Sequence, residues 1–335
     1  MTLLVIASAL VLAFCTAFFT TPYVRRLAQS VGMLDATGER RMHDQPKPRI
    51  GGIAVYLGFA LSLFAVLGYV IAKQLPFGSP RNLHDVIGLI FGGTLILMVG
   101  IWDDIMGMSP RGKLFAQFVV AATSLLYGFR IDFINNPFHH GQPIFFHPAL
   151  ACVITVVWYL GLMNAINFID GLDGLLSGLT AISGFSMLSV AVVSGHPEVA
   201  LLLAPLIGGA LGFLPYNWNP AKIILGDSGA LFIGYVFATI SIVQATKTTV
   251  AISLLVPLVV LGLPVLDTAA AIIRRTRAGK KIYEADRGHF HHQLIFRFGL
   301  NVRQAVLLIY VVCIVLGLLA FTLSVGVGSL RLADL

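Results

Sequence analysis

Two amides and two carboxylates recur at every third position between two long apolar runs, at Asn164, Asn167, Asp170 and Asp173. Residues three apart on a helix share one face, and the glycines that follow let the chain turn. The neighbouring apolar runs predict that these groups lie at the end of a membrane helix, facing water. Oxygen ligands of this kind suit Mg²⁺, with Mn²⁺ as an alternative, so the stretch predicts a cation site at the membrane surface.

Two further acidic motifs adjoin apolar runs. Asp103 and Asp104 close one run, and Asp227 opens another within a Gly-Asp-Ser-Gly sequence. The pair is interpreted as handling a metal or a phosphate, against the alternative of solvated carboxylates whose charge Arg111 and Lys113 offset. Asp227 could instead simply cap a helix. Carboxylates from several loops would repel one another without a cation, which favours a divalent metal completed by phosphate substrates.

Basic and imidazole side chains mark two other loops. His289, His291 and His292 follow Arg287, and Lys47 lies in a segment rich in proline and glycine. Zinc is disfavoured at the histidines because no cysteine accompanies them and the spacing does not match a usual zinc pair. Binding of a phosphate or sugar is favoured over an ordinary surface loop. Lys47 and Arg49 could meet an anion at the membrane surface, and the alternative for Arg49 is the ordinary basic flank of a membrane segment.

The composition indicates which elements must position these residues. Of 335 residues, 57% are hydrophobic and 11% are charged, whereas a soluble domain carries about 25% charged residues. Continuous apolar runs in lipid form helices, so we expect an all-α polytopic membrane protein of about ten transmembrane helices in one domain, 1–335. The three cysteines show no disulfide or zinc spacing. The expected helices span 2–21, 52–72, 85–102, 114–129, 149–165, 175–193, 199–215, 228–245, 250–273 and 304–325.

The distribution of charge predicts the orientation in the membrane. The net charge is +7, and because the basic residues flank membrane segments, topology explains them better than nucleic-acid binding. Positive charge marks the cytoplasmic side, so both termini are expected outside the cytoplasm. Asp267 falls inside the expected helix 250–273, about 10 Å below the surface, where an acid is usually functional or paired. The loops expected in the cytoplasm, which carry the active site, are 22–50, 103–113, 164–174, 215–228 and 273–303.

Taken in order, these motifs resemble the polyprenyl-phosphate N-acetylhexosamine-1-phosphate transferase family, glycosyltransferase family 4. The resemblance covers nearly the whole chain, through residues 43–52, 103–104, 164–174, 225–229, 267 and 286–292. It implies that a polyprenyl phosphate attacks the β-phosphate of a UDP-N-acetylhexosamine to give a lipid-diphosphate sugar and UMP. It also implies a requirement for Mg²⁺ and a location in the bacterial cytoplasmic membrane.

The resemblance also implies roles for single residues. Asp103, Asp104 and Asp227 would be catalytic, and Asp227 and Asn167 would bind the metal. The implied substrate-binding residues are Lys47, Asn164, Asp170, Asp173, Arg287, His289, His291 and His292. Asp103 is the candidate to orient the lipid phosphate or accept its proton. Direct displacement is preferred because a phosphate monoester is largely dianionic at pH 7, and a route through an aspartyl phosphate stays open.

Several alternatives remain at this point. Phe290 interrupts the histidine run, which favours the GlcNAc-1-phosphate branch of the family over the muramoyl-pentapeptide branch. A secondary transporter would place ionisable groups near the bilayer midplane, often in repeated halves, whereas here the acids gather on one side and no repeat is visible. A membrane scaffold would leave those acids unexplained. A homodimer and the glycan pathway served are left open.

Overall fold

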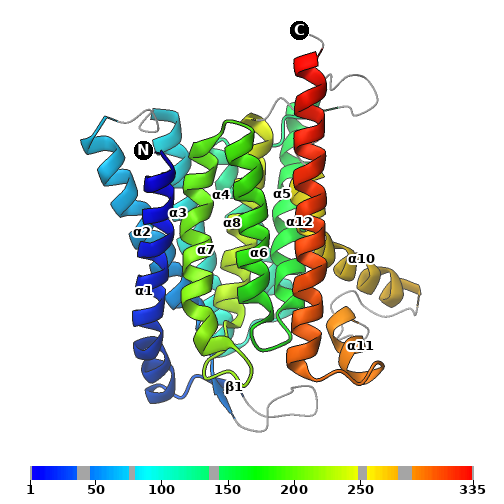
Figure 1. Cartoon of the computed structure of the whole chain (residues 1–335). Coiled ribbons are helices and arrows are strands. Elements are labelled where there is room, and N and C mark those ends of the chain that lie inside the picture. The colour runs from blue at the N-terminus through cyan, green and yellow to red at the C-terminus, as the bar shows by residue number, and fades with distance from the viewer. Residues whose placement is uncertain are drawn as a thin grey trace.

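The computed structural model describes residues 2–35, 46–74, 80–135, 143–247, 255–277 and 289–333. Long helices run side by side in a bundle, and α1 begins at the same end of the bundle at which α12 ends (Figure 1). The helices are α1 Thr2–Ser30, α2 Gly52–Ala72, α3 Pro80–Met106, α4 Pro110–Leu126, α5 Pro148–Ile169, α6 Leu175–Val193, α7 Pro197–Asn217, α8 Gly226–Lys247, α9 Leu255–Val260, α10 Gly262–Arg277, α11 Phe290–Phe296 and α12 Val302–Ala333.

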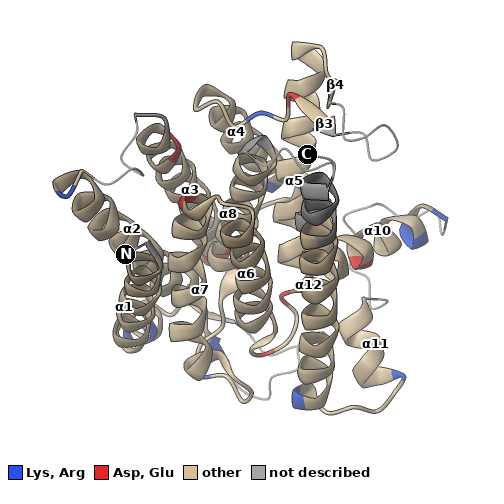
Figure 2. Cartoon of the chain, turned by 45° about the horizontal axis from the view of Figure 1, so that its top comes forward, with Lys and Arg blue, Asp and Glu red and all other residues tan. Residues whose placement is uncertain are grey.

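Eight helices in the described part of the chain are long and apolar enough to cross a membrane: α1, α2, α3, α5, α6, α7, α8 and α12. Few charged residues are found along the middle of the bundle helices, and most lie near helix ends, in loops or in α10 (Figure 2). The protein is therefore a mostly helical, multi-pass membrane protein. Helix α4 has 17 residues, and residues 248–254 lie outside the described part. The count of ten crossings and the side on which each loop lies stay predictions.

The structure departs from the expected elements at several places, of which three concern the segments that carry the motifs or lie near them. Helix α1 continues through Pro22 to Ser30, although a proline usually marks a helix end. Two small hairpins add strands to a chain expected to be all-α: β1 Leu34–Asp35 with β2 Lys47–Pro48, and β3 Phe133–Asn135 with β4 Pro143–Phe145. Strands of two or three residues are too short to leave an alternating pattern in the sequence. Helix α3 extends beyond Asp104 to Met106, so the acidic pair lies in its last turn.

The single helix expected at 250–273 is wrong. The described chain forms α9 and then α10, with a turn at Leu261 between them. Pro264 cannot donate the backbone hydrogen bond to Val260 that a continuous helix needs, and Gly262 lowers the cost of the break. Helix α10 projects sideways from the bundle (Figure 1). Asp267 lies in α10, which has 16 residues, and the depth expected for it in the membrane stays a prediction.

Helix α8 forms the centre of the bundle and is buried along its whole apolar length. It packs against α3, α5 and α2. Glycines allow the closest approaches at its first turn: a Cβ on Gly52 would overlap the backbone of Gly229, and a Cβ on Gly100 would overlap that of Ser228. Backbones can meet this closely only where side chains are absent. The start of α8 is thereby fixed between α2 and α3.

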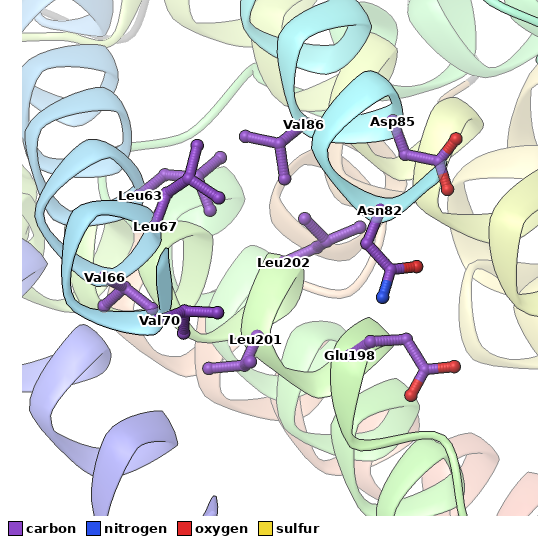
Figure 3. Close-up of a pocket in the computed structure, with 10 residues that line it drawn as sticks. All are labelled: Leu63, Val66, Leu67, Val70, Asn82, Asp85, Val86, Glu198, Leu201 and Leu202. Carbon is purple, nitrogen blue, oxygen red and sulfur yellow. The ribbon is translucent and has the colours of Figure 1, made fainter. Parts of the chain in front are cut away.

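An apolar cleft between α2, α3 and α7 lies at the end of α3 opposite to Asp103 and Asp104. Leucine and valine side chains form its wall, and Asn82, Asp85 and Glu198 line one edge (Figure 3). None of these residues belongs to a motif singled out in the sequence. The cleft is remote from the candidate site described next.

Candidate active site

The Asp227 carboxylate, in the first turn of α8, is the point where three helix ends meet. Its Oδ1 accepts hydrogen bonds from Asn167 Nδ2 at 2.5 Å and from Lys113 Nζ at 2.8 Å. Its Oδ2 lies 3.5 Å from Arg49 Nη2. Asn167 comes from the last turn of α5 and Lys113 from the first turn of α4. The structure therefore brings the predicted metal residues Asp227 and Asn167 into direct contact.

Lys113 links Asp227 to the acidic pair. Its Nζ lies 2.8 Å from Asp103 Oδ2 and 3.3 Å from Asn167 Oδ1, in addition to its contact with Asp227. Asp103 is held in place because its Oδ1 accepts a hydrogen bond from the Met108 backbone at 2.7 Å. Sequence reasoning gave Lys113 no more than charge compensation. The available signal was its place in the first turn of the helix that follows the acidic pair.

Asp104 points in another direction from Asp103. Its Oδ1 accepts a hydrogen bond from the backbone N–H of Asp227 at 2.9 Å, and its Oδ2 accepts one from that of Ser228 at 3.0 Å. Arg49 Nη2 lies 3.2 Å from Asp104 Oδ1. Both Asp104 oxygens thus contact the start of α8. Arg49 adjoins two of the predicted catalytic carboxylates, whereas the sequence had indicated it only as a contact for an anion.

Lys47 and Asp173, both predicted to bind substrate, form a partly buried ion pair. Lys47 Nζ lies 2.8 Å from Asp173 Oδ2, which also accepts hydrogen bonds from Asn219 Nδ2 at 3.0 Å and from the Ala221 backbone at 2.9 Å. The carboxylate therefore ties the segment before α2 to the loop between α7 and α8. Backbone hydrogen bonds from Gly51 and Gly52 to residues 224 and 225 extend the same connection.

Asp170 lies in the turn between α5 and α6, close enough to other carboxylates for their charges to affect its pKa. Burial is the largest cause that raises its pKa to about 8, followed by the charges of Asp227 and Asp104, against an opposing effect of Arg49. A carboxyl group with this pKa is largely protonated at pH 7. An added cation nearby would favour its ionised form.

One of the predicted histidines, His291 in α11, reaches this turn. Asp267 on α10 accepts a hydrogen bond from the Phe290 backbone at 2.9 Å, and its other oxygen lies 3.0 Å from His289 Nδ1. His291 packs its ring against Gly171, where an added Cβ would overlap Nε2. Asp267 is therefore a paired acid, and its partner is one of the predicted histidines.

The His291 ring is buried, and neither of its nitrogens has a hydrogen-bond partner among the described residues. Burial, followed by the neighbouring His292, lowers the pKa of His291 to about 3. The ring is therefore neutral at pH 7 and presents unused polar atoms next to the Asp170 turn. Arg287, also predicted to bind substrate, lies outside the described residues.

Asn164 lies one helical turn deeper in α5 than Asn167. Its Nδ2 donates to Gln117 Oε1 at 2.6 Å and to the Leu160 carbonyl at 2.8 Å. Gln117 is in turn four residues after Lys113 on α4. This hydrogen bond holds α4 and α5 together directly behind the contact between Lys113 and Asn167.

The oxygen atoms around the Lys113 ammonium group supply some of the ligands that a hard divalent cation needs. Asp227, Asn167 and Asp103 all direct oxygens at the ammonium group, and Mg²⁺ prefers such ligands with the remainder supplied by water and phosphate. Within the described ranges, no three His, Cys, Asp or Glu side chains form a complete metal site. The residues therefore fit an incomplete shell, which would need further oxygen ligands from outside the protein.

Comparisons with known proteins give relatives along almost the whole chain. The model of a family described as "Glycosyl transferase family 4" matches residues 86–245. A protein named probable undecaprenyl-phosphate N-acetylglucosaminyl 1-phosphate transferase, from Bacillus subtilis (strain 168), is 35% identical over 95% of this chain and 85% of its own length.

Two further relatives carry similar names. The decaprenyl-phosphate N-acetylglucosaminephosphotransferase of Mycolicibacterium smegmatis is 33% identical over 91% of this chain and 78% of its own length. The undecaprenyl-phosphate alpha-N-acetylglucosaminyl 1-phosphate transferase of Escherichia coli (strain K12) is 27% identical over 92% of this chain and 81% of its own length.

Proposed function

Because the chain belongs to glycosyl transferase family 4, we propose that it transfers N-acetylglucosamine 1-phosphate from UDP-GlcNAc to undecaprenyl phosphate. The products are undecaprenyl-diphosphate-GlcNAc and UMP. The relatives are named for N-acetylglucosaminyl 1-phosphate or N-acetylglucosamine phosphate transfer with undecaprenyl or decaprenyl phosphate, which supports both the sugar and the lipid class. The reaction would take place at the cytoplasmic face of a bacterial inner membrane.

The observation that carries the proposal is the meeting of Asp103, Lys113, Asn167 and Asp227 at one end of an apolar bundle. Phosphoryl transfer depends on positioning and charge neutralisation more than on covalent chemistry by the protein. This cluster offers a fixed ammonium for phosphate oxygens, and carboxylate and amide oxygens for a cation. Its place at the ends of membrane helices suits an acceptor whose chain lies in lipid and whose phosphate lies in water.

The reaction balances as a direct displacement. An oxygen of the lipid phosphate forms a bond to the β-phosphorus of UDP-GlcNAc, and the bond from that phosphorus to the bridging oxygen breaks to release UMP. The second pKa of a phosphate monoester is near 6, so the acceptor needs little help from a base. Asp103 would orient the lipid phosphate and accept any remaining proton, and Lys113 would hold the anionic groups together.

Mg²⁺ would be held by Asp227 and Asn167, with Mn²⁺ as an alternative. When bound, the cation would neutralise charge on the diphosphate. Lys47, Asp170 and the histidines of α11 would line the nucleotide and sugar-phosphate side. The neutral His291 ring, with two nitrogens available, would be suited to donate a hydrogen bond there.

The test is transfer by the purified protein in detergent with undecaprenyl phosphate and Mg²⁺. UDP-GlcNAc and UDP-MurNAc-pentapeptide are supplied separately, and UMP and the lipid product are both measured. We expect UMP and a lipid-linked GlcNAc with UDP-GlcNAc alone, and neither product from the Asp227→Asn variant. Turnover of the pentapeptide substrate alone would contradict the choice of sugar, and silence with both donors would contradict the proposal.

A further inference from the structure

Asp104 completes the hydrogen bonding of the first turn of α8. The first backbone N–H groups of a helix have no partner within it. Here two of them, from Asp227 and Ser228, donate to the two oxygens of Asp104 at 2.9 and 3.0 Å. A carboxylate from α3 therefore serves as the cap that α8 does not supply from its own sequence. Gly226 makes room for it, because a Cβ at that position would clash with the Asp104 carboxylate.

The register of α3 explains why the two adjacent acids differ. Gly100 and Asp104 are four residues apart, so they lie on the same face of the helix, and both contact the start of α8. Asp103 is turned by about 100° from Asp104 and reaches Lys113 instead. Exposure follows the same division: the side chain of Asp104 is 0% exposed, that of Asp103 is 9%, and that of Asp227 is 20%.

We propose that Asp104 is a positioning residue, which fixes the first turn of α8 so that the Asp227 carboxylate meets Asn167 and Lys113. Asp104 itself takes no part as base, nucleophile or metal ligand, because both of its oxygens are engaged and its side chain is fully covered. The role that Asp227 then plays in transfer rests on the proposed function. The fixing of α8 by Asp104 does not.

Arg49, in the segment that precedes α2, helps to hold Asp104 and the start of α8 in place. Its guanidinium lies 3.2 Å from Asp104 and 3.5 Å from Asp227, so it offsets the charge of a covered carboxylate. The arginine therefore contacts both Asp104, the cap, and Asp227, the residue that the cap positions. A change at Asp104 is therefore transmitted to Asp227 through the α8 backbone and through Arg49.

The first test is hydrogen exchange of the metal-free protein in detergent, followed on the peptide that covers the start of α8, with no substrate present. Asp104→Asn keeps the shape and one oxygen acceptor but loses the second acceptor and the charge. We expect exchange at the Asp227 and Ser228 amides to be about tenfold faster, because a hydrogen bond to a charged group is lost. In the control Asp103→Asn these amides should exchange as in the wild type. Unchanged exchange in Asp104→Asn would overturn the proposal, whatever reaction the protein catalyses.

The second test is transfer measured over a range of Mg²⁺ concentrations. A looser Asp227 should raise the Mg²⁺ concentration for half-maximal activity of Asp104→Asn several-fold, while turnover at saturating Mg²⁺ stays within about tenfold of the wild type. A reacting carboxylate would behave differently: its loss would abolish turnover at every Mg²⁺ concentration and leave the α8 amides protected. That second pattern would show that Asp104 belongs to the reacting groups and would refute its role as a cap.

Discussion

Replacing Lys113 by methionine removes an ammonium group that contacts Asp103, Asn167 and Asp227 together. Methionine keeps most of the length of the side chain and leaves those oxygens without their shared donor. Breaking a buried ion pair costs about 3–5 kcal/mol. The Lys113 side chain keeps 17% exposure, so solvent screening favours the lower end of this range, about 3 kcal/mol. If that energy is lost from the transition state, kcat/KM falls by roughly 100-fold.

The assay is release of UMP from UDP-GlcNAc with undecaprenyl phosphate, at several Mg²⁺ concentrations. The loss of positive charge should leave Asp103 and Asp227 more attractive to a cation, so half-saturation by Mg²⁺ should need less metal. This shift is opposite in sign to the one expected for Asp104→Asn. The two variants therefore separate the loss of a charge at the site from the loss of a cap behind it.

Arg111→Met is the matched control for Lys113→Met. Arg111 lies two residues earlier in the same turn of α4 and is exposed, and the same replacement there should leave kcat/KM within about threefold of the wild type. Lys113→Arg keeps the charge but replaces a compact ammonium by a wider planar group, so only partial activity is expected. Wild-type activity of a Lys113→Met variant that thermal unfolding shows to be folded would refute the reasoning.

Three further predictions concern Asp170 in the turn between α5 and α6, Asp267 on α10, and the metal. The pKa of Asp170 in the folded protein is raised to about 8, so above its ordinary pKa the folded state holds a proton that the unfolded state has released. The metal-free protein should therefore lose stability as the pH rises from 5.5 to 8.5. Thermal unfolding in EDTA should show a weaker dependence on pH for Asp170→Asn. Asp267→Asn weakens the contact with His289 and should raise the KM for UDP-GlcNAc more than it lowers kcat; an unchanged KM would argue against a role for α11 in donor binding. Excess EDTA should stop transfer and Mg²⁺ should restore it, and activity that persists in the chelator would exclude the proposed metal.

The helices could be predicted where length and apolar composition alone decide them. Helix α6 begins and ends at the expected residues, Leu175 and Val193, because Gly174 and Ser194 flank a mainly apolar run without a charged residue or a proline. The polar stretch from Asn164 to Asp173 does lie at a helix end, as its neighbours required. The break between α9 and α10 was harder to predict, because the apolar run continues across it and only Gly262 and Pro264 mark it.

The sequence indicated several residues that the structure brings close together, but not the contacts that each of them makes. The motifs named Asp103, Asn167 and Asp227 correctly as neighbours, since the expected loops share one side of the membrane. Lys113 was missed because a lysine near a helix start is common in membrane proteins. The different directions of Asp103 and Asp104 depend on which face of α3 meets α8. That face is set by tertiary packing at Gly100, which the pattern of apolar residues does not reveal.

The chemistry of the site therefore depends directly on how α8 packs in the bundle. A buried helix points its N-terminus, with its partial positive charge, toward the end of the bundle where the carboxylates gather. The close glycine contacts of Gly52 and Gly100 hold that terminus between α2 and α3, and the Asp104 carboxylate completes its hydrogen bonds. A larger residue at Gly100 would displace Ser228 and, with it, Asp227. Mutations at such covered glycines should thus reduce activity through the position of α8, even though the glycines contact no substrate.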